Sequence, residues 1–310
     1  MNISSFKKVG TANKAKAAPR QAVRHQHGPL VKRSDAPAII RVDNLTMGWD
    51  EVVLQQDLSF EVKRGEVFSI LGGSGCGKST LLRYLVGLEA IAKGGSITVE
   101  GKNDIDLDDG LPPFGVMFQG GALFGSQTVG ENVELPLEEW TDLKPDAISA
   151  IARAKLRLVG LDGAYDKFPN ELSGGMKKRA AIARALALEP DLVFLDEPSA
   201  GLDPVTSSEL DDLILILNRS LCLTVVIVTH ELESIFKIVS RCIMLDKESK
   251  SMIAMGQPRE LQQSTDPRVS GFFNRKSADA HEAALVPHSV RDEAPSSAAD
   301  WAGRGPETKG

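Results

Sequence analysis

Hydrophobic residues along this chain fall into short runs separated by polar turns, and the character of the runs changes near residue 67. Before that point apolar and polar residues alternate, as in a strand with one buried face. From Val67 onward the strand-like runs are apolar throughout, which is typical of parallel strands covered on both sides. We therefore expect an antiparallel layer beside a parallel sheet. The predicted strands are 39–42, 58–62, 67–71, 96–99, 115–118, 192–195, 224–228 and 242–245.

Four other segments carry apolar residues at helical spacing. They are 80–87, 145–159, 174–188 and 206–218. Helices that alternate with apolar strands predict an α/β fold. Because no strand pattern occurs between about 131 and 188, we expect that stretch to be a helical subdomain inserted into the α/β core.

Composition narrows the class of protein. The chain has 310 residues, an apolar fraction of 42% and a net charge of −6, which suits a globular core and gives no overall attraction to nucleic acid or acidic lipid. No window reaches the roughly 18 apolar residues that a membrane span needs. The longest run, 221–228, contains Thr224 and suits a buried strand. Any membrane role is therefore expected to act through partners.

The two ends differ in composition from the centre. Residues 1–36 are rich in lysine and arginine, with Asp35 as their single acid and no apolar core of a secretory signal. We expect a disordered basic arm; weak contact with an anionic membrane surface and a transit peptide are the alternatives. Residues 275–310 have the composition of a disordered tail, which leaves 37–274 as the folded domain.

A glycine-rich segment joins the strand at 67–71 to the helix that begins near Thr80. Glycines let backbone N–H groups approach a phosphate closely, and a helix N-terminus attracts the same anion. This arrangement is typical of a P-loop, in which a lysine neutralises phosphate charge and a hydroxyl holds Mg²⁺. A glycine turn without a ligand is the alternative. The predicted nucleotide-binding residues are Gly72, Gly73, Ser74, Gly75, Cys76, Gly77, Lys78, Ser79 and Thr80.

Three cysteines, Cys76, Cys222 and Cys242, form an odd set without metal spacing. We therefore expect a reducing, cytosolic setting. Cys76 lies beside a lysine and a helix N-terminus, so its thiol pKa is expected to be lowered and the thiol to react with alkylating agents when nucleotide is absent.

Two carboxylates end the apolar strand at 192–195. Asp196 is placed to hold Mg²⁺ beside the phosphate loop, and Glu197 points elsewhere, where it can act as a general base on the attacking water. A pair of solvated strand-end acids is the alternative. Upstream, Ser173, Gly174 and Gly175 open a helix, with Ser173 as its expected N-cap, and present a second phosphate-binding turn. By itself that sequence is also a common turn.

The order of these motifs resembles that of ABC-transporter ATPase subunits over about 39–273. The resemblance implies the P-loop ABC ATPase fold, with a RecA-like mixed sheet, an antiparallel β layer and an inserted helical subdomain. It also implies ATP and Mg²⁺ as cofactors and a head-to-tail homodimer, in which Ser173 and Gly175 bind the γ-phosphate on the other subunit. Mg²⁺ would be held by Ser79, Gln119 and Asp196.

Further site residues follow from the same resemblance. Trp49, which we place before the first strand pair, matches the aromatic residue that stacks on adenine, with a packed surface aromatic as the alternative. Gln119 matches the glutamine that reaches Mg²⁺ and water and relays nucleotide state to the membrane partner. Asp203 matches an aspartate that communicates across the dimer. His230 matches the histidine that contacts γ-phosphate, and the alternative is a structural histidine.

Finer features resemble the ATPases of MCE-associated lipid transporters of the Mla or toluene-tolerance type. They are Met176 in place of the usual glutamine and the segments 118–124, 128–133, 135–137 and 266–273. Two departures are Lys177 and Lys178 after the Ser173 turn and the acidic stretch 106–109.

This resemblance implies a peripheral ATPase on the cytoplasmic face of the inner membrane that moves phospholipid or a related hydrophobic molecule between membranes. Its partners would be permease subunits, contacted near 119–137, an MCE-domain protein and a small regulatory subunit, and no nucleic acid. An importer of another solute, such as an amino acid or anion, and a soluble ABC ATPase acting on nucleic acid or ribosomes remain as alternatives.

Overall fold

A computed structural model describes residues 36–49, 52–91, 94–103 and 112–275. The chain divides into two units, 1–273 and 274–310, and both sheets belong to the first. The predicted basic arm, the predicted C-terminal tail, Asp50 and the acidic stretch 106–109 lie outside the described residues, except for a residue or two at the inner edges of the arm and tail. Among the described residues no helix is both long and apolar enough to cross a membrane.

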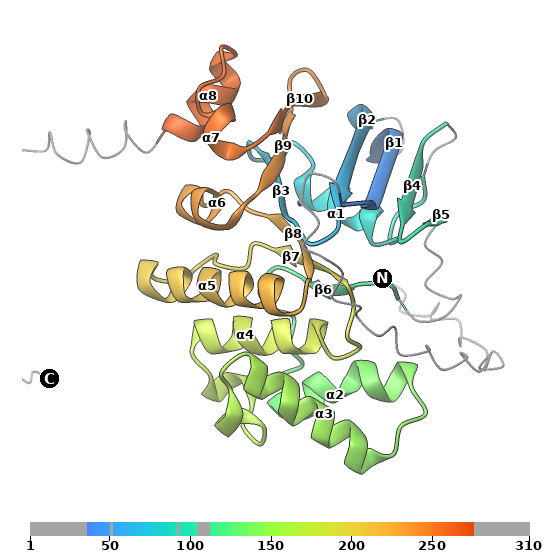
Figure 1. Cartoon of the computed structure of the whole chain (residues 1–310), viewed down its shortest axis with the longest axis vertical. Coiled ribbons are helices and arrows are strands. Elements are labelled where there is room, and N and C mark those ends of the chain that lie inside the picture. Colours follow the sequence, from blue (N-terminus) through green and yellow to red (C-terminus); the bar gives the residue numbers. More distant parts are fainter. Residues whose placement is uncertain (1–35, 50–51, 92–93, 104–111, 276–310) are drawn as a thin grey trace, which may run out of the picture. The chain divides into compact units, whose positions relative to one another are not determined.

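The described strands form two sheets (Figure 1). One sheet is antiparallel in the order β2-β1-β4-β5, and the other has the order β10-β9-β3-β8-β7-β6. In the second sheet neighbours are parallel except for β10, which runs antiparallel to β9. The strands are β1 (Ala38–Trp49), β2 (Val52–Lys63), β3 (Val67–Gly72), β4 (Ser96–Val99), β5 (Lys102–Asn103), β6 (Gly115–Met117), β7 (Leu192–Asp196), β8 (Thr224–Val228), β9 (Arg241–Asp246) and β10 (Ser251–Gly256).

Along the chain, most of the helices connect the strands of the six-stranded sheet, and three of them, α2 to α4, come between β6 and β7. The helices are α1 (Lys78–Leu85), α2 (Val129–Trp140), α3 (Pro145–Leu158), α4 (Gly174–Ala185), α5 (Pro204–Ser220), α6 (Leu232–Ile238), α7 (Pro258–Leu261) and α8 (Pro267–Asn274), with short 3-10 turns at Asp162–Ala164 and Pro169–Glu171. The predicted strands and helices are all present. The predicted change of sheet type at residue 67 is wrong for β4, which alternates in burial and pairs with β1.

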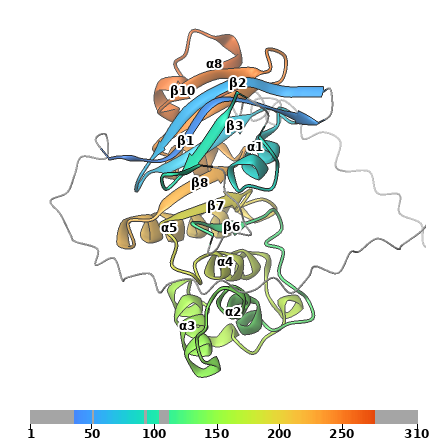
Figure 2. The same cartoon turned by 90° about the vertical axis from the view of Figure 1, so that its right-hand side faces the viewer.

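The six-stranded sheet separates two hydrophobic cores. On one side α1 and the antiparallel sheet pack against residues such as Phe68, Phe194 and Val226. On the other side α2 to α5 pack against Val193, Leu195 and Val225, which alternate with the first set along the same strands. Figure 2 shows α1 above and α4 below this part of the sheet. Because side chains of a strand alternate between faces, each strand serves both cores.

Two features differ from the prediction. Helix α2 begins the stretch expected to be helical, 131–188, but was not among the four helices predicted individually. Helix α2 contains Pro136, which removes a backbone donor, but the reciprocal Thr128–Glu131 capping box starts the helix and buried Val133 anchors it. Strands β1 and β2 are longer than predicted. Each contains a polar residue at an irregular position of the pairing, Asn44 and Asp57, with left-handed φ values of 48° and 54°. These polar residues interrupt the alternation on which the prediction depended.

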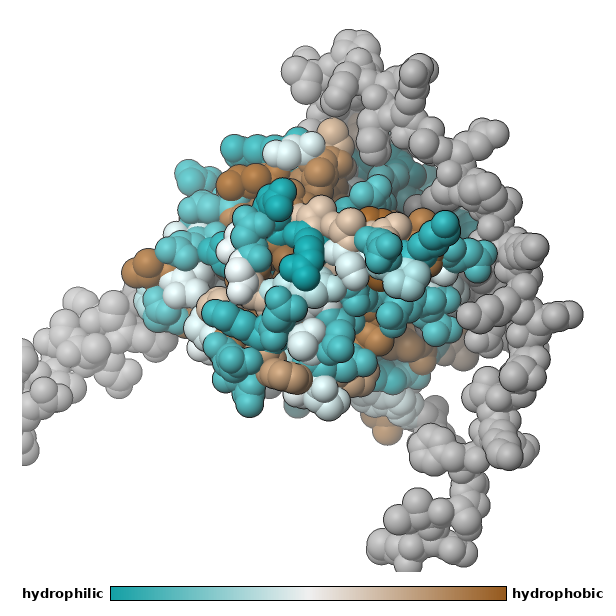
Figure 3. Space-filling model, turned by 90° about the horizontal axis from the view of Figure 1, so that it is seen from below, coloured by the Kyte–Doolittle hydropathy of each residue, from teal (hydrophilic) through white to brown (hydrophobic). Residues whose placement is uncertain are grey.

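Viewed from the helical end, the surface is mostly hydrophilic (Figure 3).

Candidate nucleotide site

The phosphate loop lies between the carboxyl end of β3 and the start of α1. Gly73, Ser74 and Gly75 are exposed, and so is Ser79 in the first turn of the helix. The Lys78 ammonium donates hydrogen bonds to the carbonyl oxygens of Gly72 at 2.9 Å and Gly73 at 3.0 Å. The lysine is therefore folded back over the loop, with its charge held where a phosphate would meet it.

The base of the loop is packed against the sheet. A Cβ on Gly72, whose φ is 146°, would lie 2.4 Å from the Leu245 carbonyl oxygen, so a larger residue does not fit. Buried Gln55 donates from Nε2 to the carbonyl oxygens of Cys76 at 2.9 Å and Asp246 at 2.8 Å. Gln55 was not predicted, because only the folded chain brings β2, the loop and β9 together.

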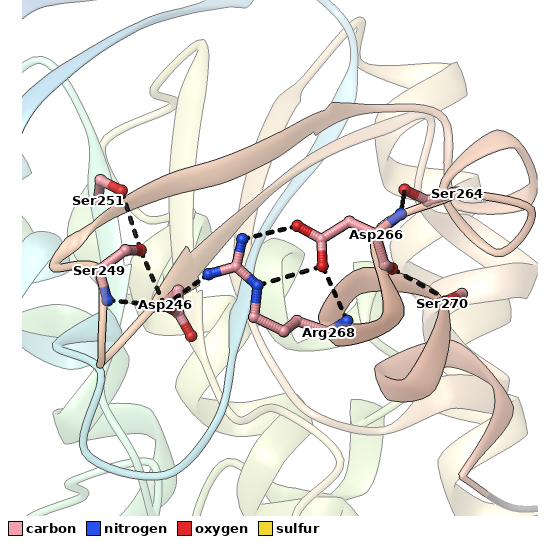
Figure 4. A network of polar contacts seen from close by, with 7 residues as sticks. All are labelled: Asp246, Ser249, Ser251, Ser264, Asp266, Arg268 and Ser270. Carbon is pink, nitrogen blue, oxygen red and sulfur yellow. Dashed lines mark hydrogen bonds and ion pairs between the residues drawn. The ribbon is translucent and has the colours of Figure 1, made fainter.

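Asp246 also belongs to a polar network that holds the C-terminal helix (Figure 4). Its Oδ2 accepts from Ser249 Oγ at 2.8 Å and from Arg268 Nη1 at 3.3 Å, and Arg268 Nη2 donates to Asp266 Oδ2 at 2.7 Å. The end of β9 is thereby tied to α8 by its side chain and to the phosphate loop by its backbone.

Cys76 behaves differently from the prediction. Its side chain is 1% exposed, and burial raises the pKa of the thiol; the nearby Lys78 charge lowers it by less. Burial wins because the thiolate loses its hydration, whereas the lysine is engaged by backbone carbonyls. The expected lowering of the pKa is therefore wrong, and Cys76 is a packed part of the loop. Its alkylation in the absence of nucleotide stays a prediction.

The acidic strand ends beside the phosphate loop. Asp196 is 6% exposed, and its Oδ1 has no hydrogen-bond partner among the described residues. Burial raises the pKa of Asp196 to about 6, and the neighbouring Glu197 adds to the rise, while the charges of Lys178 and Lys78 oppose it. A buried carboxylate that lacks a donor is suited to bind a cation.

Glu197 directly follows Asp196 and has a left-handed backbone, with a φ of 48°. Its N–H donates to the Val228 carbonyl oxygen at 2.8 Å. Its Oε1 lies 2.8 Å from His230 Nδ1, and its buried Oε2 has no partner among the described residues. The structure thus brings two of the predicted catalytic residues together, from the ends of neighbouring strands β7 and β8.

Ser173 caps α4 as expected, since its Oγ accepts from the Met176 N–H at 3.3 Å. A Cβ on Gly175 would lie 2.5 Å from Thr206 Cγ2, so this turn packs closely on the start of α5. There Asp203 caps α5 by accepting from the N–H groups of Val205 and Thr206, both at 3.1 Å, and these bonds lower the pKa of its carboxyl. The Ser173 turn belongs to the helical face of the sheet, opposite α1.

Two predicted residues lie at exposed positions. Gln119 is exposed in the turn that follows β6. Trp49 was predicted to precede the first strand pair. Instead it ends β1, pairs with Val52 and is 49% exposed. The prediction missed its place because only two residues, 50 and 51, separate β1 from β2 in the sequence.

Comparison with known proteins identifies the family. Residues 55–200 match the model of the ABC transporter family. The intermembrane phospholipid transport system ATP-binding protein MlaF of Haemophilus influenzae is 38% identical over 244 residues, which is 77% of this chain and 91% of that protein. The MlaF of Escherichia coli K12 is 40% identical over 70% of this chain and 82% of its own length. The probable ribonucleotide transport ATP-binding protein mkl of Mycobacterium leprae is 40% identical, over 76% of this chain and 68% of that protein.

Solved structures agree with this assignment. A dimeric ATP-binding cassette in a post-hydrolysis state, bound to ADP and Pi, superposes with a TM-score of 0.62 at 30% identity, over 70% of this chain and 98% of that one. The cbiO1 protein of Clostridium perfringens gives a TM-score of 0.66 at 28% identity, over 80% and 98%. The predicted resemblance and fold are confirmed, and the chain belongs to the ATP-binding subunits of the ABC transporter family.

Proposed function

We propose that this chain is the ATP-hydrolysing subunit of an ABC complex that moves phospholipid or a related hydrophobic molecule between membranes. The pairing of Glu197 with His230 at 2.8 Å, beside the buried carboxylate of Asp196, is the observation that carries the proposal. Support for the cargo comes from the two MlaF proteins, whose names specify intermembrane phospholipid transport. The mkl protein carries a name for ribonucleotide transport, which keeps another solute as the competing cargo.

ATP would bind with its phosphates against the loop from Gly72 to Thr80. Lys78 would exchange the carbonyls of Gly72 and Gly73 for phosphate oxygens, which are better partners for an ammonium group. Mg²⁺ fits this site, because Asp196 offers a buried oxygen that has no donor among the described residues, and Ser79 offers an exposed hydroxyl in the first turn of α1. Gln119 is proposed as a third contributor. The ion would neutralise charge that develops on the phosphates.

Hydrolysis would depend on Glu197 as general base. Its Oε2 is the carboxylate oxygen that has no protein donor among the described residues, so it is the oxygen available to take a proton from water. His230 holds the other oxygen through Nδ1 and would reach γ-phosphate from the end of β8. General-base assistance of this kind contributes roughly 10² to 10⁴ in rate.

Two copies would complete each site. Ser173, Gly174 and Gly175 lie on the helical side of the sheet, whereas α1, the helix that follows the phosphate loop, lies on the other side. A second chain packed head to tail would bring its Ser173 turn to this chain's phosphates, and Asp203, beside that turn through Thr206, would lie at the contact. Trp49 would stack on adenine from the β1–β2 hairpin.

The membrane partner would dock at the loop that carries Gln119. This loop exposes Phe118 and, at 58%, Phe124, and Arg184 of α4 holds it by donating to the carbonyl oxygens of Gly121 and Ala122, both at 2.8 Å. A movement of Gln119 on nucleotide binding would therefore displace the surface to which a permease is attached. We propose permease subunits, an MCE-domain protein and a small regulatory subunit as partners, with the chain at the cytoplasmic face of the inner membrane.

The test uses Glu197→Gln in the full-length chain, purified with its membrane partner. ATP binding should persist while kcat falls by roughly 10² to 10⁴, and a closed dimer should accumulate with Mg-ATP. Glu248→Gln, at an exposed position in the turn between β9 and β10, is the matched control and should leave kcat unchanged. Unchanged hydrolysis would remove Glu197 from its role. Transfer of labelled phospholipid between vesicles, compared with uptake of a ribonucleotide, separates the two cargoes.

A further inference from the structure

Lys178 is a buried cation at the centre of α4. Its side chain is 6% exposed in a helix whose other buried residues are glycine, alanine and isoleucine. Lysine is rarely buried without a partner, because removing its charge from water is costly. Burial lowers the pKa of the Lys178 ammonium, and the carboxylates of Glu197 and Asp196 counteract part of that shift. The lysine is therefore held by specific partners at the end of β7.

Its hydrogen-bond partner is the backbone of Glu197. The Lys178 Nζ donates to the Glu197 carbonyl oxygen at 3.0 Å, which also accepts from the Ala200 N–H at 3.3 Å. The left-handed backbone of Glu197, with a φ of 48°, is unfavourable for a residue with a side chain and persists only where surrounding contacts hold it. Lys178 supplies one of those contacts from a different element.

The backbone conformation of Glu197 decides where its carboxylate points. One oxygen lies against His230 Nδ1, and the other is buried without a partner among the described residues. A shift of about 1 Å at a catalytic group can reduce the rate by roughly 10²-fold. A contact that fixes the Glu197 peptide therefore bears on hydrolysis although it does not touch the reacting atoms.

Helix α4 connects this contact to the Ser173 turn. Ser173 is the N-cap of α4, and Lys178 lies in the second turn of the same helix. Because a short helix moves as one body, a displacement of the turn displaces the ammonium as well. The turn would face the nucleotide bound by the other subunit, whereas the ammonium contacts Glu197 of its own subunit.

We propose that Lys178 is a positioning residue for Glu197, and that α4 links the Ser173 turn of each subunit to the hydrolytic carboxylate of the same subunit. Binding of nucleotide at one site would thereby set the base at the other. The inference rests on the proposed roles of Glu197 and Ser173.

The first test compares Lys178→Met, Lys178→Arg and Lys177→Met in the full-length chain with its membrane partner. Methionine keeps the length of the side chain but cannot donate, so kcat for ATP should fall ~10- to 100-fold with KM changed less than about twofold. Arginine should restore at least half of kcat. Lys177 is the adjacent, less buried lysine of α4 and serves as the control, with kcat unchanged. A rise in KM with unchanged kcat would overturn the proposal.

A second test uses mixed dimers that each contain one chain with Lys78→Ala, so that a single working phosphate loop remains. Lys178→Met in the chain with the working loop should lower kcat ~10- to 100-fold. The same change in the other chain should leave kcat within about twofold, although that chain supplies the Ser173 turn. Equal losses in the two arrangements would show that Lys178 only supports the turn and would overturn the proposal. Unchanged hydrolysis with Glu197→Gln would instead overturn the proposed function.

Discussion

The phosphate loop and the Ser173 turn are both glycine-rich starts of helices, but the described part of the chain surrounds the first more completely than the second. The loop is held by Lys78 on two of its own carbonyls, by Gln55 from β2 and by close packing on Leu245 of β9. The turn is exposed at Ser173 and Gly174, and it packs on one side, where Gly174 lies close to Leu202 and Gly175 close to Thr206. In the proposed function, one chain builds the first site, and a partner chain would complete the second.

If the proposed dimer forms, this difference predicts that one subunit alone binds nucleotide but hydrolyses it slowly. A prebuilt anion site costs little reorganisation when the phosphates arrive. A turn contributed by another chain engages only after two chains have closed together. The proposed function would thus separate binding from hydrolysis in space, and changes on the two sides of the six-stranded sheet should have different effects.

The largest expected effect is the loss of the prebuilt site. Lys78→Ala removes the cation nearest the phosphates and should lower kcat/KM for ATP by roughly 10²- to 10³-fold. Binding of a fluorescent ATP analogue to the full-length chain should fall in parallel. Lys102→Ala, on exposed β5, is the matched control. Wild-type affinity in Lys78→Ala would mean that the loop is not the nucleotide site.

A smaller effect is expected from the turn. Ser173→Ala deletes one hydroxyl that would bind γ-phosphate, so kcat should fall roughly 10- to 100-fold while the ATP affinity of a single chain stays unchanged. The measurements are steady-state hydrolysis at dimer-forming concentration and nucleotide binding at high dilution. Ser220→Ala, at the exposed end of α5, should alter neither. If Ser173→Ala lowered kcat by the same factor at high dilution as at dimer-forming concentration, the turn would be acting within its own chain.

The third effect concerns stability. Burial raises the pKa of Asp196 to about 6 from an ordinary 3.8. Between these values the folded protein keeps a proton that the unfolded chain has released, so the free energy of unfolding falls as pH rises through this window and stays reduced above it. Asp196→Asn should raise the free energy of unfolding of nucleotide-free protein by roughly 1–3 kcal/mol at pH 7.5 and by little at pH 4.

Denaturant unfolding at the two pH values measures this effect, with the exposed Asp166→Asn as control. The same variant should lose Mg²⁺-dependent hydrolysis, which would show that the site trades stability for cation binding. If Asp196→Asn lowered the free energy of unfolding at pH 7.5, the attraction between the carboxylate and its positively charged neighbours would exceed the free-energy cost of burying it.

The sequence by itself determined the parts whose chemistry is local. The phosphate loop, the Asp196–Glu197 pair and the Ser173 cap each depend on residues adjacent in the chain, so their order and spacing were sufficient. The parallel strands were equally legible, because burial on both faces leaves continuous apolar runs. Edge strand β10 and proline-containing α2 were not, since their patterns are interrupted and their stability comes from neighbours.

Only the tertiary structure decided how these parts act on one another. Cys76 shows this most simply: adjacent Lys78 predicts a lowered pKa, but packing against the sheet excludes water and raises it. Likewise, nothing in the order of residues indicates that Gln55 supports the phosphate loop or that Lys178 holds the peptide of Glu197. Distance in space and access to solvent set the strength of hydrogen bonds and charges, and both arise only when strands and helices distant in the chain pack together.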